Sequence, residues 1–337
     1  MQSIKAEFYH YRYLVLFSLC WFALNYAAAL SFGAPFLIFT DFVKYYSYVL
    51  MQYVALCAMA LVYIALRALW RKQNAVQTVR QAVCQYVQEE RYAALLPILI
   101  AMFGIFSCVS MSKSLVQYIN PYQWDMYFYE MDIWLHGGVL PHEILLSLTP
   151  LNEFSTLMIL KLSYMFWFFV MIIAYWYVIF IDGNRVHRDR FLWASSICWV
   201  LLGGFSALYF SSVGPVFWHD FYPDLDDPYV LLNEKVDKLW GVIGVNTSEY
   251  LLTAARDETI IDVNGISAMP SMHVSVTMFV MLYGYLKSRD LGACLLIYTG
   301  LILSGSICLA WHYAVDGYYS MIATLLIWWL VGKVVKN

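Results

Sequence analysis

The stretch SAMPSMHVSVTMFVMLYGY, residues 267–285, joins an apolar segment to polar side chains that such a segment does not need. From Val274 onward the residues suit a transmembrane helix, yet Pro270, Ser271 and His273 stand at its opening. Proline is favoured at the first helical position because the N–H that it lacks would have no partner there. The pattern therefore predicts a helix with a serine and a histidine in its first turn.

The composition of the whole chain is that of a membrane protein. Of its 337 residues, 62% are hydrophobic and 13% are charged, whereas about 25% are charged in a typical soluble domain. A run of about 20 apolar residues can cross a hydrocarbon core of about 30 Å. Such runs occur at 14–38, 46–69, 92–117, 156–181, 191–213, 270–287, 291–310 and 312–332. We therefore predict an all-α, polytopic membrane helix bundle with about eight transmembrane helices.

The positions of Lys and Arg predict the orientation, because cytoplasmic loops carry an excess of these residues. If the N-terminus is cytoplasmic, 14 of the 20 Lys and Arg residues lie in the inner segments. The other six are Lys44, Lys113, Lys161, Lys235, Lys238 and Arg256. We therefore expect a multi-pass protein with both termini cytoplasmic. The loop 214–269 then faces the outer side, which can be periplasmic, extracellular or lumenal.

The connecting segments suggest two parts. Residues 1–91 would hold two N-terminal transmembrane helices and an inner amphipathic helix, since valines recur at helical spacing after Asn74. Residues 92–337 would form a six-helix catalytic core, with 214–269 as an irregular, acidic outer loop. The aromatic and acidic segment 120–145 predicts a short helix along the outer leaflet.

Several classes of site are not indicated. The seven cysteines fall in predicted helices or the inner loop, with no disulfide framework and no CxxC pair. The net charge is −3 and no basic face suggests nucleic acid. We therefore expect no metal, no cofactor and no nucleic acid. The bilayer itself and a lipid are the expected partners, and the sequence does not indicate an oligomeric state.

The N-terminus of the 270–287 helix has the properties of an anion site. The first backbone N–H groups of a helix have no intrahelical partner, and the helix dipole favours negative charge there. Ser271 adds a hydroxyl donor, and His273 can exchange a proton near neutral pH. Taken alone, the same residues also fit a helix cap and an interfacial histidine.

A second group of polar residues lies in CLAWHYAVDGYY, residues 308–319. His312 and Asp316 are four residues apart, so a helix places them on one face. A carboxylate that accepts from one ring nitrogen leaves the other free to attack, as in activated nucleophiles. A purely structural His–Asp pair is the alternative.

The predicted topology brings the two groups to one leaflet. His273 and His312 open helices that both start at the outer surface, with one inward and one outward pass between them. A nucleophile, a second histidine as general acid and an anion site are the minimum for phosphoryl transfer through a covalent intermediate.

The two motifs also resemble those of a known family. PSMH (270–273) and HYAVD (312–316) are similar to the PSGH and SRxxxxxHxxxD motifs of the type 2 phosphatidic acid phosphatase superfamily. They look closest to its inositolphosphorylceramide-synthase-like branch, over residues 92–335. The resemblance implies that His312 forms a phosphohistidine and that Asp316 orients it. It also implies that His273 protonates the leaving oxygen, that Ser271 and nearby amides hold the phosphate, and that no metal is needed.

Two positions depart from the family pattern. The arginine expected six residues before His312 is Ser306, and the segment after the fifth helix lacks the KxxxxxxRP motif. A similar spacing runs from Lys113 to Pro121, with Asn120 for Arg, but it lies two helices too early and we interpret it as a coincidence. Two cations that bind phosphate are therefore missing at their expected positions.

The missing cations favour a substrate with less charge. A phosphodiester carries one negative charge, so the sequence favours a phosphotransferase that moves a phospholipid head group. The alternative is a phosphatase that acts on phosphatidic acid or polyprenyl diphosphate. A distant alternative is a non-catalytic transporter or scramblase that uses Lys161 and Asp316. Lys161 lies inside a predicted span and is a candidate substitute cation, although its side chain can equally snorkel to the interface.

Overall fold

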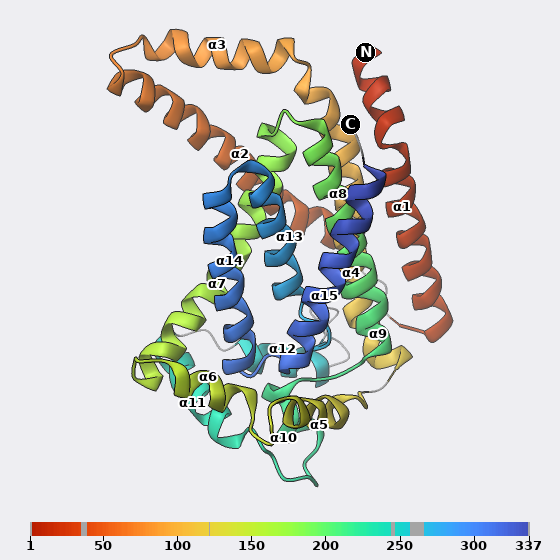
Figure 1. Cartoon of the computed structure of the whole chain (residues 1–337). Helices are drawn as coiled ribbons and strands as arrows, with labels where there is room; N and C mark the ends of the chain where they lie inside the picture. The colour runs from red at the N-terminus through yellow and green to blue at the C-terminus, as the bar shows by residue number, and fades with distance from the viewer. Residues whose placement is uncertain (1, 35–38, 121, 244–246, 257–265, 336–337) are drawn as a thin grey trace.

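The protein is a bundle of helices. The computed structural model describes residues 2–34, 39–120, 122–243, 247–256 and 266–335, and no strand occurs in these ranges. Eight helices of at least 16 residues form the bundle (Figure 1): α1 (Gln2–Phe32), α2 (Phe39–Trp70), α4 (Leu95–Ile119), α7 (Glu153–Trp176), α8 (Arg185–Val200), α13 (Met272–Lys287), α14 (Arg289–Cys308) and α15 (Ala314–Val334). The predicted all-α polytopic bundle is confirmed.

Seven helices in the described part of the chain are long and apolar enough to span a membrane, and α13 is the long helix that falls short. Its 16 residues extend about 24 Å, which is less than the ~30 Å of a hydrocarbon core. Eleven of its 16 residues are buried.

Shorter helices connect the long ones. On one side of the bundle lies α3 (Ala75–Gln88), and on the other lie α5 (Asp125–Leu135), α6 (Pro141–Leu148), α10 (Trp218–Phe221), α11 (Val230–Ile243) and α12 (Thr247–Arg256) (Figure 1). The segment 214–269 is therefore not the irregular loop that we expected, where it is described. In α11 the apolar residues Leu232, Val236 and Leu239 recur at helical spacing and are buried, which stabilises a helix there.

Helix α8 packs against α4, α13 and α15. After Val200 this helix continues through a π-helical turn, Leu201–Ser206, into α9 (Ala207–Tyr209). Gly204 in that turn lets α1 approach, because a Cβ atom there would lie 2.5 Å from the ring of Trp21. A rigid aromatic ring cannot move aside cheaply in a packed core. The close contact therefore requires glycine.

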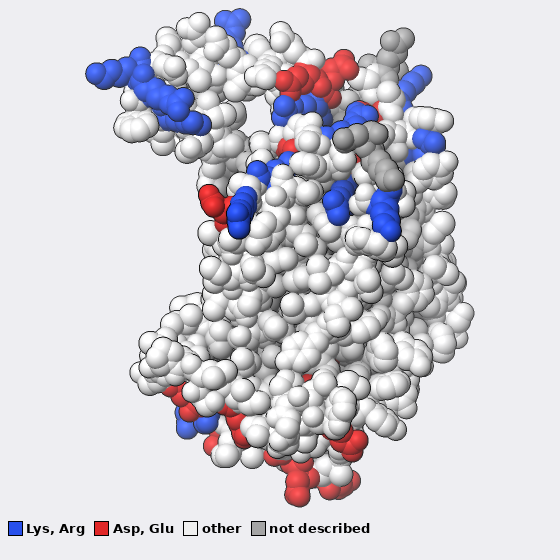
Figure 2. Space-filling model, viewed as in Figure 1, with Lys and Arg blue, Asp and Glu red and all other residues white. Residues whose placement is uncertain are grey.

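Charged residues are separated along the bundle axis. On this face, Figure 2 shows most of the Lys and Arg at the end that holds both termini and α3, with some Asp and Glu among them. The end that holds α5, α10 and α11 shows mainly Asp and Glu, with a small basic patch. The surface between the two ends carries almost no charged side chains on this face. Such a belt is what a hydrocarbon core requires of the side chains that face it.

Candidate active site

The polar opening of α13 is buried inside the protein. Ser271 is the N-cap residue and is 0% exposed, and its side chain makes no capping hydrogen bond. Its Oγ has no hydrogen-bond partner among the described residues. The Ser271 amide lies 3.4 Å from the carbonyl oxygen of Asp316, which links the start of α13 to α15. A buried hydroxyl without a partner costs free energy and is a natural ligand for a polar substrate group.

His273 is held between two aromatic rings of α7. Its ring stacks on Tyr164 at 4.3 Å between centroids and meets Trp167 at the same distance. The indole Nε1 of Trp167 also donates to the His273 carbonyl oxygen at 3.0 Å. These contacts fix the plane of the imidazole. The ring centroids of His273 and His312 are 6.1 Å apart, so both histidines face one small volume.

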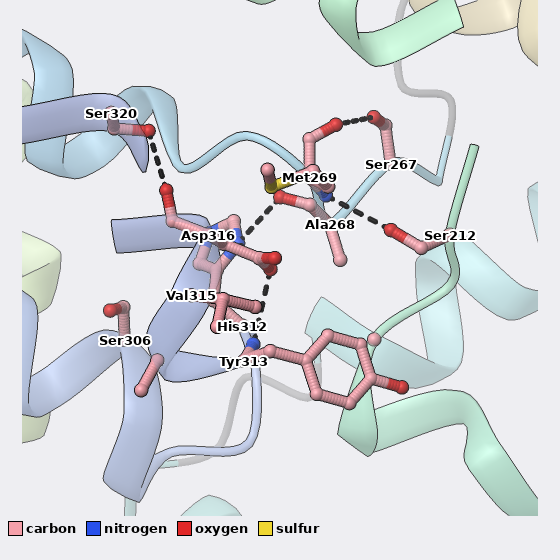
Figure 3. A network of polar contacts seen from close by, with 12 residues as sticks. Ser212, Ser267, Ala268, Met269, Ser306, His312, Tyr313, Val315, Asp316 and Ser320 are labelled. Carbon is pink, nitrogen blue, oxygen red and sulfur yellow. Dashed lines mark hydrogen bonds and ion pairs between the residues drawn. The ribbon is translucent and has the colours of Figure 1, made fainter. Parts of the chain in front are cut away.

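His312 lies in the tight turn between α14 and α15. Ala310 makes this turn possible with a φ of 61°. Nδ1 of His312 lies 2.7 Å from the carbonyl oxygen of Ala268 (Figure 3). A carbonyl oxygen can only accept, so Nδ1 carries the proton. In the neutral ring, Nε2 is then unprotonated and is the atom able to attack.

Asp316 stands beside His312 but is not its nearest acceptor. Its Oδ2 lies 3.4 Å from Nδ1 of His312 and accepts the backbone N–H of Tyr313 at 3.1 Å. Its Oδ1 is buried without a hydrogen-bond partner in the described structure. The expected proximity of the pair is present, while the hydrogen bond that orients the ring goes to Ala268.

Two carboxylates of α5 hold the start of α15 in place. Asp132 accepts the backbone N–H groups of Ala314 at 2.7 Å and Val315 at 3.0 Å. Asp125 accepts the Tyr313 hydroxyl at 2.8 Å, together with two amides and a second tyrosine hydroxyl. Burial raises the pKa of Asp132 to about 6, against these two N–H donors, which lower it. Both aspartates position the turn that carries His312.

A cavity of about 790 Å³ opens beside the two histidines. Lys113, near the end of α4, lines it together with His273 and His312. Burial is the main cause that lowers the pKa of His312 far below its usual range; the Ala268 hydrogen bond opposes this, and the positive charge of Lys113 adds to it. Lys113 is therefore close enough to act on the same volume.

Lys161 occupies a different place. It is 2% exposed, it is not among the residues that line this cavity, and the charge that acts on it is that of Asp237 in α11. The structure thus brings together Ser271, His273, His312 and Asp316, and Lys161 does not line the cavity beside them.

The departures from the family pattern have local explanations. Ser306 stabilises the turn: its Oγ donates to Leu303 and its carbonyl oxygen accepts the N–H of His312 at 3.0 Å. The Asn120 side chain donates to the carbonyl oxygens of Leu208 and Tyr209, both at 3.0 Å. Neither side chain replaces an arginine at the cavity.

Sequence reasoning missed three contributors to the site and left a fourth, Lys113, as one of several basic residues expected on the same side of the membrane. Lys113 had a usable signal, the KxxxxxxNP spacing that we set aside because of its position in the chain. Asp125 and Asp132 had a weaker one, as acids inside an aromatic segment. The Ala268 carbonyl had none, because every residue has a backbone oxygen.

Within the described residues, no group of three or more His, Cys, Asp or Glu side chains is placed to hold a metal ion.

Comparisons with known proteins agree with the motifs. A family model described as the PAP2 superfamily matches residues 128–330, which is more than half of the chain and includes both histidines. The searches of curated proteins and of solved structures gave no match.

We expect Ser271→Ala to leave the thermal stability unchanged or slightly raised, because the hydroxyl makes no hydrogen bond in the described structure. Ser320→Ala is the matched control, since Ser320 is equally buried and donates to the Asp316 carbonyl at 2.7 Å. Loss of this hydrogen bond in Ser320→Ala should lower the free energy of unfolding by about 1 kcal/mol. Melting temperatures in detergent check both. A lower melting temperature for Ser271→Ala would show that its hydroxyl is part of the resting fold.

Proposed function

The chain belongs to the PAP2 superfamily, and we propose that it is a lipid phosphotransferase that works through a phosphohistidine. It would move a phosphorylated head group from a phospholipid donor to an acceptor alcohol. The observation that carries the proposal is the position of His312, whose Nδ1 is engaged with Ala268 and whose other nitrogen is left free beside His273.

In the first step, Nε2 of His312 attacks the phosphorus atom of the donor. The bond between phosphorus and the lipid oxygen breaks as the P–N bond forms, and protonated His273 gives its proton to the departing oxygen. Asp316, 3.4 Å from Nδ1, stabilises the positive charge that the His312 ring acquires. A general acid at this point typically accelerates the reaction by about 10²–10⁴.

In the second step, His273 acts as the base. It takes the proton of the acceptor hydroxyl as that oxygen attacks phosphorus and the P–N bond breaks. His312 returns to its neutral form with the proton still on Nδ1. The acceptor now carries the head group, and His273 is protonated for the next cycle.

The phosphate would be held by Lys113, by the free N–H groups at the start of α13 and by the Ser271 hydroxyl, which is fully buried and is not itself among the residues that line the cavity. Lys113 lines the cavity with both histidines, and helix N-termini bind anions. One lysine matches the single negative charge of a phosphodiester. The PSMH and HYAVD forms point in the same direction, toward the inositolphosphorylceramide-synthase-like branch.

The second candidate is a lipid phosphate phosphatase, which the PAP2 superfamily match supports. Water would replace the acceptor alcohol in the second step, and inorganic phosphate would leave. His312 would again be the nucleophile and His273 the general acid and base. The two functions therefore differ only in the acceptor and in the charge of the substrate.

We also propose that the site faces the outer side of the membrane and that both termini are cytoplasmic. The support is the separation of charge in Figure 2, where the basic end carries the termini and the site lies toward the acidic end. Positive residues remain preferentially on the cytoplasmic side.

The purified protein should turn over at least one member of a panel of phospholipids, lipid monophosphates and polyprenyl diphosphates, in detergent with a chelator and an acceptor alcohol. A new phosphodiester without free phosphate identifies the transferase, and release of phosphate identifies the phosphatase.

His312→Ala should lose at least about 10³-fold in kcat, because it removes the nucleophile. Activity that survives in this variant contradicts the phosphohistidine mechanism, and lipid movement without any turnover would support a transporter.

Lys113→Ala should lower kcat/KM by about 10–10²-fold, the worth of one charged hydrogen bond. Lys161→Ala is the matched control and should change it by less than about threefold, since Lys161 does not line the cavity. Melting temperatures verify that both variants fold. The opposite order of effects would assign the phosphate to Lys161.

The orientation predicts which thiols an impermeant maleimide reaches in intact cells. Cys84 of α3 is exposed but should react only after the cells are lysed. A cysteine introduced by Glu234→Cys on α11, where the native side chain is exposed, should react at once. Reversed labelling of these two positions would place the site on the cytoplasmic side.

A further inference from the structure

The cavity beside the histidines extends far beyond the catalytic groups. On α4 its lining runs from Lys113 to Leu99, and on the antiparallel α7 it runs from Tyr164 to Tyr175 and, past the end of that helix, to Ile179. Fourteen residues of α-helix correspond to about 21 Å. The cavity is therefore a channel along most of the membrane thickness, with the histidines at its outer end.

The chemistry of the wall changes along this length. The polar and charged lining groups Lys113, His273 and His312 lie at the outer end. Further in, the wall consists mainly of apolar side chains, among them Met102, Phe103, Phe106, Phe168, Met171 and Ile172.

Two of the tyrosine hydroxyls in this part of the wall are engaged with protein groups. That of Tyr46 donates to the Phe103 carbonyl at 3.0 Å, and that of Tyr175 accepts from Trp199 at 3.2 Å. The Ser107 hydroxyl also lines this part and has no hydrogen-bond partner among the described residues. The mainly apolar walls suit a hydrocarbon chain.

One wall of the channel comes from α2. Tyr46, Val49, Leu50 and Tyr53 line it, and α2 closes against the bundle through the ring contacts of Tyr46 with Phe103 at 4.1 Å and of Tyr53 with Phe180 at 5.5 Å. Both α2 and α4 lie outside the residues that match the PAP2 superfamily. Eleven of the 31 residues that line the channel therefore come from the part of the chain that precedes the family match.

We propose that this channel binds one straight hydrocarbon chain of the substrate lipid, with the phosphate at Lys113 and the chain end near Leu99 and Ile179. C–C bonds of about 1.5 Å at angles near 111° advance ~1.25 Å per carbon, so the channel holds a chain of about 16–18 carbons. The volume of about 790 Å³ lies within the range of pockets that enclose a ligand. This inference rests on the proposed function for the position of the phosphate.

The test uses hexadecyl phosphate with a diazirine at the chain end, bound to the His312→Ala variant so that no turnover intervenes. Photolysis should label residues around Leu99 and Ile179, and unlabelled hexadecyl phosphate should compete at least about tenfold better than octyl phosphate, which leaves the inner end unfilled. Labelling confined to lipid-facing residues such as Leu96 and Ile100, or labelling that no competitor reduces, overturns the proposal.

A matched pair of variants extends the test. Leu99→Trp fills the inner end and should weaken hexadecyl phosphate binding about tenfold through overpacking, with octyl phosphate unchanged. Ile100→Trp adds the same ring next to it on the exposed face of α4 and should change neither. Equal loss of both ligands in Leu99→Trp contradicts a channel that measures chain length. If the inner end is labelled saturably but the wild-type protein turns over no lipid, the channel is supported and the proposed reaction is contradicted. If a lipid is turned over but the labelling is unselective, the reaction is supported and the channel is contradicted.

Discussion

The hydrogen bond from Nδ1 of His312 to the carbonyl oxygen of Ala268 is the contact on which the site depends. It joins the segment before α13 to the turn before α15, and it decides which ring nitrogen is free. The acceptor is neutral, so the resting site needs no buried ion pair to hold the ring, and such pairs are costly to desolvate. Asp316, slightly farther away at 3.4 Å, then becomes important only when the ring gains positive charge.

That contact is in turn held by a small network of backbone bonds. Ser212 accepts the amides of Ala268 at 2.9 Å and Met269 at 3.1 Å, through its carbonyl and hydroxyl oxygens (Figure 3). Asp125 and Asp132 hold the neighbouring turn and the start of α15 from the surface helix α5. Burial raises the pKa of both carboxyl groups, against their N–H and O–H donors. Buried networks of this kind rigidify a site only when their members are satisfied together, so α5 contributes to the orientation of His312.

Hydropathy was enough to predict the eight long helices, because each must bury or expose a continuous apolar surface in the membrane. The four-residue spacing of His312 and Asp316 was enough to predict that they are neighbours. The helices of the segment 214–269 were not predicted because they are short and bury only one face. In α11 that buried face includes Leu232. Lys113 and Asp132 could not be placed, since the contacts of Asp132 with α15 join residues 182 and 183 positions apart. Such contacts depend on how helices pack, which a single sequence does not encode locally.

The burial of Ser271 and His312 affects how a lipid substrate would bind. Moving a phosphate from the interface to Lys113 removes water from an anion, which is unfavourable unless other interactions offset it. A hydrocarbon chain held along about 21 Å of channel can supply that free energy far from the reacting atoms, as remote binding groups do in other enzymes. Once the phosphate is in place, the low polarity around it strengthens its attraction to Lys113 and to the N-terminus of α13. In the proposed complex the apolar walls therefore bind the hydrocarbon chain and the few polar groups at their end bind the phosphate, and both are needed for binding.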